Sequence, residues 1–400
     1  MSINKRIYAD NGATTKTSDA AITAMMPYMD KIYGNPSSLH SAGQEAAEAL
    51  KDARQRCAAV LGCMENEVYF TSGGSESDNQ AIISAAISGK KKGKGHIIST
   101  EIEHHAVLHT LDKLKRHGFD VTLLPAHENG IIIPEELEAE IRPDTALVSV
   151  MYANNEIGTI QPIRKIGEIC QSRGVIFHTD AVQAAGHIPV NMSEDMTDMM
   201  SLSAHKFHGP KGAGILCCRY GVSLTPLIEG GAQERGRRGG TENLPAIMGM
   251  AAALEESVKN MKSSSAKLIS MRDRLIRGLL QIPRTILNGD AEKRLPGNVN
   301  VCFEGIEGES LLLLLDDRGI CASSGSACTS GSLDPSHVLL AIGRPHEIAH
   351  GSLRLTLSDE NTEEEIDYIL REIPKAVEYL RSISPVWHDL EMGVLEHVIQ

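Results

Sequence analysis

A cysteine near the C-terminal end of the chain stands in a setting that suits chemistry better than packing. Cys328 ends the stretch Cys321-Ala-Ser-Ser-Gly-Ser-Ala-Cys328 and is followed by Thr-Ser-Gly-Ser, a run of small residues that favours neither helix nor strand. A packed cysteine has apolar neighbours, whereas this thiol is predicted to lie on an exposed, flexible loop of about residues 321–333. Cys321 directly follows Gly319-Ile320 and is predicted to be a structural thiol at the base of that loop.

A lysine far upstream is the second candidate. Lys206 follows Ser203-Ala-His205 at the end of a predicted strand, where a partly desolvated lysine loses its charge more easily. A neutral amine can form a Schiff base with an aldehyde, and Ser203 and His205 could contact a phosphate beside it. The alternative for any single lysine is a surface side chain in a polar turn. Together with Cys328, an aldehyde-binding lysine would indicate an enzyme that transfers sulfur.

Polar residues at the ends of two other strands would suit a pyridine ring. Asp180 ends the apolar run Val175–Asp180, and a buried carboxylate needs a cationic partner such as a protonated ring nitrogen. Gln183 and Asn155 would reach the phenolic oxygen of the same ring. The alternatives are a helix cap for Asp180 and a turn residue for Asn155.

A phosphate cradle and a ring-stacking imidazole complete the candidate site. Thr71-Ser-Gly-Gly-Ser-Glu-Ser-Asp-Asn79 follows a strand and opens a helix, so backbone N–H groups at Gly74 and the hydroxyls of Ser72 and Ser75 could bind phosphate. The alternative is a glycine turn that caps a helix. His104 begins the next helix and could lie on a cofactor ring, although His105 fits the spacing equally well.

Composition limits the class of protein. The chain has 400 residues, is 42% hydrophobic and carries a formal charge of −13, which argues against nucleic acid or anionic membrane as a partner. Its eight cysteines show neither disulfide nor zinc spacing. No run of some 18 apolar residues occurs, and the N-terminus lacks the apolar core of a signal peptide. We expect a cytoplasmic protein with reduced thiols.

Apolar β-branched runs alternate with helical patterns, which predicts an α/β fold around a mostly parallel sheet. A large domain is predicted over residues 14–258, and a smaller α+β domain over 1–13 and 259–400, which carries the Cys328 loop. The expected strands are residues 67–71, 96–100, 121–124, 146–152, 175–180, 199–203 and 214–218. The expected helices include residues 163–173, 243–259, 266–280 and 362–380.

Ten motifs in family order resemble those of the cysteine desulfurases of the NifS/IscS class, which are pyridoxal-phosphate enzymes of fold type I in the class-V aminotransferase family. The resemblance covers nearly the whole chain. The matching segments are Tyr8 to Thr15, Gly34 to His40, Thr71 to Asn79, Glu103 to Val107, Asn154 to Gly158, His178 to Gln183, Ser203 to Gly212, Gly230 to Asn243, the loop around Cys328, and Gly351 to Thr356.

The resemblance implies a role for each matching residue. Lys206 would bind the cofactor aldehyde, Asp180 the pyridine nitrogen, and His104 rather than His105 would stack on the ring. Arg354 would hold the substrate carboxylate with help from Asn155. Thr241 would reach the phosphate of a neighbouring subunit, which implies a homodimer. The phosphate would also be held by Gly74, Ser75, Ser203 and His205.

The implied reaction converts L-cysteine to L-alanine and leaves a persulfide on Cys328, the nucleophile. The sulfur would pass to an acceptor, such as a scaffold of the NifU/IscU type, for iron–sulfur cluster assembly or another thiolation. Gly12 and Ala9 depart from the family pattern, and Gly74-Ser75 stands where Ala-Thr is common. The C-terminal tail also lacks the ending of members that dock a scaffold there. The alternatives are a selenocysteine lyase, another pyridoxal-phosphate lyase or aminotransferase, and a sulfur carrier without activity.

Overall fold

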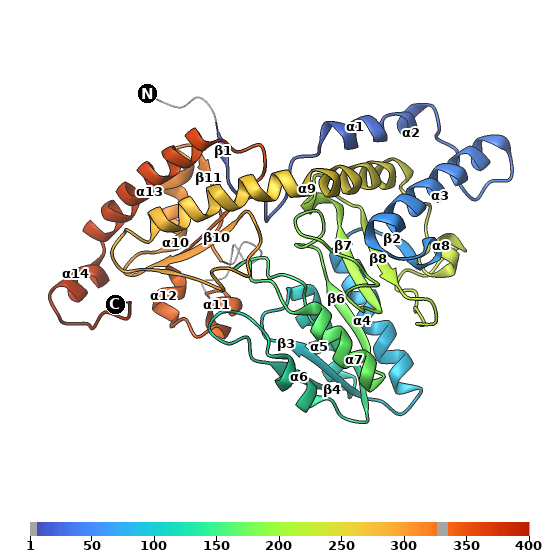
Figure 1. Cartoon of the computed structure of the whole chain (residues 1–400), viewed down its shortest axis with the longest axis horizontal. Coiled ribbons are helices and arrows are strands. Elements are labelled where there is room, and N and C mark those ends of the chain that lie inside the picture. The colour runs from blue at the N-terminus through green and yellow to red at the C-terminus, as the bar shows by residue number, and fades with distance from the viewer. Residues whose placement is uncertain (1–5, 326–334, 400) are drawn as a thin grey trace.

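A seven-stranded sheet forms the centre of the computed structural model, which describes residues 6–325 and 335–399 (Figure 1). The strand order is β2-β8-β7-β6-β5-β3-β4, and β8 alone runs antiparallel to its neighbours. All seven predicted strands are present, and their ends agree within a few residues. The strands are β2 (Val68–Thr71), β3 (His96–Thr100), β4 (Asp120–Leu124), β5 (Thr145–Ser149), β6 (Ile176–Asp180), β7 (Met199–Ser203) and β8 (Gly214–Cys218).

Helices cover the sheet with their apolar faces. In α5 (His105–Arg116), Val107, Leu111 and Leu114 recur at helical spacing and are buried. The α4 helix (Gly74–Lys90) lies against β5, β7 and β8. The other helices of this part are α1 (Asp19–Met25), α2 (Pro27–Asp30), α3 (Ser41–Leu61), α6 (Pro134–Glu140), α7 (Ile163–Arg173) and α8 (Gln233–Gly236), with the 3-10 turns η1 (Glu65–Glu67) and η2 (Ala204–Lys206).

The prediction of two separate helices over residues 243–280 is wrong, because one helix, α9 (Leu244–Leu279), spans the region. No residue of α9 between 255 and 267 is buried, so the apolar pattern that reveals a helix disappears there. Ser263 hydrogen-bonds back to the carbonyl of Asn260 at 2.8 Å, which keeps the serine-rich stretch compatible with the helix.

A second group of elements lies at the far end of α9 (Figure 1). Its apolar core includes Met271 and Leu275 from α9, Val299 and Leu353 from the strands, and Ile369. The division into domains at residue 258 stays a prediction. The strands of this group are β1 (Ile7–Tyr8), β9 (Thr285–Leu287), β10 (Asn298–Phe303), β11 (Ile320–Cys321) and β12 (Ser352–Thr356). The helices are α10 (Gly308–Asp317), α11 (His337–Ala341), α12 (His346–His350), α13 (Glu363–Ser382) and α14 (Pro385–Glu391).

The strands of this group pair in two sheets. β10 pairs antiparallel with β9 and β12, and β1, from the start of the chain, pairs parallel with β11. The predicted C-terminal helix begins as expected, because Thr362 and Glu365 form a capping box at the start of α13. Within residues 6–325 and 335–399, no helix has the length and apolar character needed to cross a membrane.

Candidate functional site

Lys206 lies in η2, directly after β7, and its amine points to the N-terminal segment (residues 10–15). The Nζ atom donates hydrogen bonds to the carbonyl oxygens of Gly12 at 2.6 Å and Ala13 at 2.9 Å. The backbone of Thr15 in turn donates to the carbonyl of His205 at 2.9 Å. The N-terminal segment therefore lies across the end of β7 and holds the amine in one direction.

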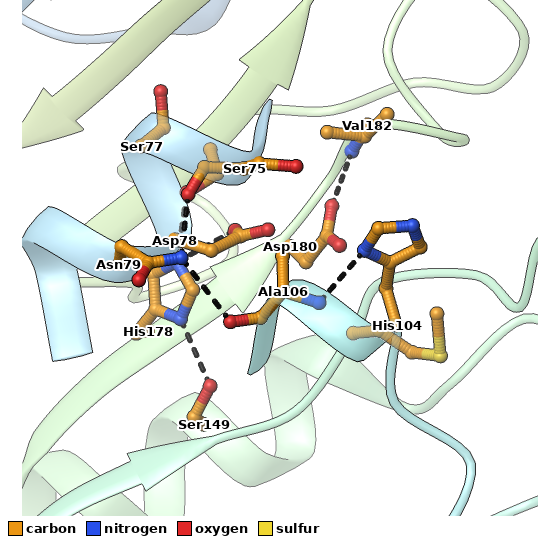
Figure 2. Close-up of polar contacts among 12 residues, drawn as sticks. Ser75, Ser77, Asp78, Asn79, His104, Ala106, Ser149, His178, Asp180 and Val182 are labelled. Carbon is orange, nitrogen blue, oxygen red and sulfur yellow. Dashed lines mark hydrogen bonds and ion pairs between the residues drawn. The ribbon is translucent and has the colours of Figure 1, made fainter. Parts of the chain in front are cut away.

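Asp180 ends β6 and is 6% exposed. Its Oδ1 atom accepts a hydrogen bond from the backbone of Val182 at 2.9 Å (Figure 2). Burial raises the pKa of Asp180 to about 6, although the Val182 amide and the charge of Lys206 oppose the shift. Gln183 donates to the carbonyl of Gly12 at 3.0 Å, so Lys206 and Gln183 converge on one backbone oxygen. Three of the predicted site residues are thus brought together.

His104 and His105 differ in their surroundings. His104 caps α5, and its Nδ1 atom accepts a hydrogen bond from the backbone of Ala106 at 3.1 Å (Figure 2). Burial, reinforced by the charge of Lys206, lowers the pKa of His104 to about 4, so its imidazole is neutral at neutral pH. The ring of His105 instead lies 5.0 Å from that of His109 and 4.7 Å from that of His337. His104 is therefore the imidazole that shares the surroundings of Lys206.

The predicted phosphate cradle lies where α4 begins. A Cβ on Gly74 would come within 2.6 Å of Val182, so the close approach of the two segments requires glycine. Ser203 places its Oγ atom 3.4 Å from the Cβ position of Gly73, and Ser75 is exposed in the first turn of α4. The N-terminus of α4 therefore combines free hydroxyls with a helix end that favours an anion.

Two other cradle residues hydrogen-bond within the chain. Ser72 was expected to offer its hydroxyl to phosphate, but both its backbone N–H and its hydroxyl donate to Glu76. His205 lies 3.1 Å from the hydroxyl of Thr14 through Nδ1, and burial lowers its pKa to about 4. A neutral His205 would act on a phosphate as a hydrogen-bond donor rather than as a cation.

Arg354 lies in β12 and is 2% exposed. Its Nη1 atom donates to the carbonyl of Asn155 at 3.0 Å, and Nη2 pairs with Asp10 at 3.1 Å. The Nε atom is buried without a hydrogen-bond partner among the described residues. A buried guanidinium with one open donor is suited to an anionic ligand. The side chain of Asn155 is half-buried beside it.

The remaining predictions concern the Cys328 loop and Thr241. Cys328 lies outside the described residues, whereas Cys321 is in β11, as expected for a thiol at the base of the loop. Thr241 is exposed and lines a cavity of about 60 Å³ together with Ser72 and Gly212.

Both flanks of the Cys328 loop approach Glu156. Gly325 donates from its backbone to the hydroxyl of Ser352 at 3.1 Å, and a Cβ on Gly325 would lie 3.2 Å from Glu156. On the other side, the Ser336 hydroxyl bonds to Glu156. Since Glu156 follows Asn155 directly, both flanks are anchored next to Arg354 and its contact with Asn155.

Several residues of the site had not been singled out from the sequence. Asp10 pairs with Arg354, and Asp78 and His178 are buried near Asp180 (Figure 2). Glu103 is also fully buried, and the charge of Asp180 contributes to its raised pKa. Glu103 accepts hydrogen bonds from Thr100 at 2.7 Å and from the backbone of Met151 at 2.9 Å. The available signal was the presence of ionisable residues inside or beside predicted buried segments.

The family model described as "Aminotransferase class-V" matches residues 7–369. The "Cysteine desulfurase IscS" of Methanosarcina thermophila is 54% identical over 383 residues, which cover 96% of this chain and 95% of the relative. The chain belongs to the cysteine desulfurases. A "Cysteine desulfurase" of a Nostoc species is 49% identical over 391 residues, or 98% of this chain and 97% of the relative.

Solved structures agree with this assignment. One described as "NIFS-LIKE PROTEIN" has a TM-score of 0.88 and 40% identity, and the match covers 94% of this chain and 100% of that one. Another, "SspA in complex with cysteine", has a TM-score of 0.79 and 35% identity over 89% of this chain and 100% of the other. The predicted family and the fold type I α/β class are confirmed.

Proposed function

We propose that the chain is a pyridoxal-phosphate-dependent cysteine desulfurase that acts on L-cysteine and releases L-alanine, with Lys206, Asp180 and Arg354 at the centre of its site. The observation that carries the proposal is the convergence of Lys206, Gln183 and Arg354 on the N-terminal segment, next to Asp180. Lys206 bonds to the carbonyls of Gly12 and Ala13, and Gln183, three residues after Asp180, shares the Gly12 carbonyl. Arg354 pairs with Asp10 in the same segment.

The residues present fit pyridoxal 5′-phosphate. Asp180 is a buried acid that a protonated ring nitrogen would neutralise, Gln183 and Asn155 supply amides for the phenolic oxygen, and neutral His104 suits a ring face. When bound, the cofactor supplies an aldehyde for an amine and a ring that withdraws electrons from the substrate α-carbon. Gly74, Ser75, Ser203 and His205 would hold its phosphate, with Thr241 contributed by a second subunit.

Substrate binding and proton transfer are assigned to different side chains of the site. Arg354 would bind the substrate carboxylate, because its Nε atom is buried without a hydrogen-bond partner among the described residues. Asp10 and the carbonyl of Asn155 hold the guanidinium in place. Lys206 Nζ would take the proton from the substrate α-carbon, for which a neutral amine is required. Neutral His104 would serve in proton transfer at the substrate without adding charge to the site.

Cys328 would be the nucleophile that accepts the sulfur. Its thiolate attacks the substrate sulfur, the new S–S bond forms as the substrate Cβ–S bond breaks, and the electron pair stays on Cβ, which is protonated to give the methyl group of alanine. The product on the protein is a Cys328 persulfide. The flanks of the loop, anchored at Glu156, support this role because they begin and end next to the Arg354 contact.

A homodimer is part of the proposal. The helices and loops of residues 22–39 expose large apolar side chains, and Tyr33 and Leu39 are 79% and 93% exposed. Such a patch on a monomer is expected to be covered by a partner. The other exposed apolar residues in this region are Ile22, Met26 and Met29. A second copy on this face would agree with the exposed position of Thr241.

The sulfur acceptor is proposed to be a scaffold or carrier protein, such as one of the NifU/IscU type, in iron–sulfur cluster assembly or another thiolation. This rests on the family resemblance, with which the IscS names of relatives agree. We propose a cytoplasmic location on the sequence grounds given above.

The test is a paired assay of the wild type and Cys328→Ala. Both purified proteins are expected to show the visible absorption of bound cofactor, whereas only the wild type should release alanine and sulfide from L-cysteine with a reductant. Full sulfide release by Cys328→Ala would overturn the role of the thiol and favour a lyase. Keto acid without sulfide would instead favour an aminotransferase.

A further inference from the structure

A row of polar side chains crosses the central sheet directly beneath Asp180. His178 lies two residues before Asp180 on β6, so both side chains point to the same face of the sheet. Its Nδ1 atom is 2.9 Å from the hydroxyl of Ser149 on β5, and its Nε2 atom is 2.9 Å from the hydroxyl of Ser201 on β7. All three side chains are fully buried. Each imidazole nitrogen therefore has a partner, which fixes the ring. Figure 2 shows the contact with Ser149.

Asp78 reaches this row from α4. It is 1% exposed, and its Oδ1 atom lies 3.6 Å from His178 Nε2 without a hydrogen-bond partner in the described part of the chain. Burial, followed by the charge of Asp180, raises the pKa of Asp78 well above its ordinary value. His178 supplies no compensating charge, because burial lowers its pKa to about 3.

Two carboxyl groups in one buried site do not both ionise readily. Asp180 has the better support for a negative charge, since it accepts the Val182 amide and is attracted by Lys206. Glu103, the third carboxyl near Asp180, is fully buried and has its pKa raised to about 8 by burial. His104, whose pKa burial lowers to about 4, adds no positive charge at neutral pH. The site is therefore arranged to hold one negative charge, on Asp180.

We propose that Asp78, buried beside His178 beneath Asp180, is a positioning residue that leaves Asp180 as the carboxylate that would bind the ring nitrogen of the cofactor. This inference rests on the proposed function, because it assigns a role toward the same cofactor. An ionised Asp78 would compete with Asp180 for the ring proton. An apolar side chain at position 78 would remove the polar neighbour of His178 Nε2 and change the packing beneath Asp180.

The experiment measures binding of pyridoxal 5′-phosphate to the apoproteins and the pH titration of the visible band. Asp78→Asn keeps a neutral polar group of the same shape, so its Kd should stay within about threefold of the wild type. Asp78→Leu should weaken binding about tenfold or more and shift the titration midpoint by about one pH unit. Ser99→Ala is the matched control. Ser99 lies on β3, one strand farther from Asp180 than Ser149, and its hydroxyl donates to the carbonyl of Ser149 at 2.8 Å. This variant should lower the melting temperature and leave the cofactor Kd and the titration midpoint unchanged.

Equal loss of binding in Asp78→Asn and Asp78→Leu would overturn the proposal, since the charge would then matter. Unchanged binding and titration in both would overturn it as well. Infrared spectra of the apoproteins give a readout that survives poor folding of Asp78→Leu. The wild type minus Asp78→Asn difference spectrum at pH 7 should show a protonated carboxyl band, because the contribution of Glu103 is common to both proteins and cancels. Failure of the wild type to bind the cofactor would refute the proposed function, while the infrared comparison would still test Asp78.

Discussion

The two sides of the site are built in different ways. The floor, formed by Asp78, His178 and Asp180, is positioned by neighbouring strands of the sheet and by the helix that packs on it. The substrate side, formed by Asp10 and Arg354, joins residues 344 positions apart. The floor depends on the register of a buried sheet, whereas the substrate side depends on contacts between the two ends of the chain, among them the Asp10–Arg354 ion pair. The comparison indicates that cofactor binding and substrate binding can be altered separately.

Arg354→Lys should give the largest effect and should separate the two sides. A lysine cannot reproduce the planar fork of donors, so kcat/KM for L-cysteine should fall by about 10²–10³-fold. Cofactor content, measured from the visible band, should remain that of the wild type. A fall of less than about tenfold in steady-state kinetics would contradict the assignment of the substrate carboxylate to Arg354.

Asp10→Asn should reduce stability as well as substrate binding. The change leaves the 2%-exposed side chain of Arg354 without its counter-charge, which should lower the free energy of unfolding by about 3 kcal/mol. Urea denaturation of the apoprotein measures the loss. Lys16→Ala is the control, because Lys16 also bridges the two ends of the chain, to Glu360, but both side chains are exposed. It should cause no measurable change. Equal losses of unfolding free energy in Asp10→Asn and Lys16→Ala would refute the stabilising role of the buried Asp10–Arg354 ion pair.

Glu103→Gln tests the buried surroundings of the floor through the pH dependence of stability. Burial raises the pKa of Glu103 from 4.5 to about 8, so the folded protein holds a proton that the unfolded chain releases. The stability from this group is therefore present below pH 4.5 and is lost as the pH rises toward 8. Glutamine stays neutral and keeps an oxygen for Thr100 and Met151.

The wild type should thus lose stability relative to Glu103→Gln by up to about 1.4 kcal/mol per pH unit across that range. Urea unfolding of both proteins at several pH values between 5 and 8 gives the difference. Parallel stability curves would show that Glu103 is ionised when folded.

The sequence predicted much of this arrangement, for reasons that differ between regions. Buried strands are visible in the sequence as apolar runs. All seven strands of the sheet could therefore be predicted, together with the positions of Asp180 and Lys206 at or just after strand ends. The choice of His104 over His105 needed the family resemblance, because both fit the start of a helix. The continuity of α9 could not be predicted, because the middle of this helix has no buried side chain and therefore no apolar pattern.

Three of the residues that were missed, Asp10, Asp78 and His178, have partners that are distant in the sequence. Asp10 is an ordinary acidic residue until β12 brings Arg354 beside it. Asp78 and His178 are separated by 100 residues and meet only when α4 packs on the sheet. Spacing within a segment reveals periodicity, but it does not reveal which segments meet.

The continuous α9 helix also bears on how the chain unfolds. Its first half is buried in the core of the large sheet and its second half in the core of the other group, with 13 residues between them that have no buried side chain. At about 1.5 Å per residue, this middle section separates the two cores by about 20 Å of helix. Unfolding of either core would free its half of α9 and destabilise the rest of this shared helix. The two cores are therefore expected to unfold cooperatively, in a single transition.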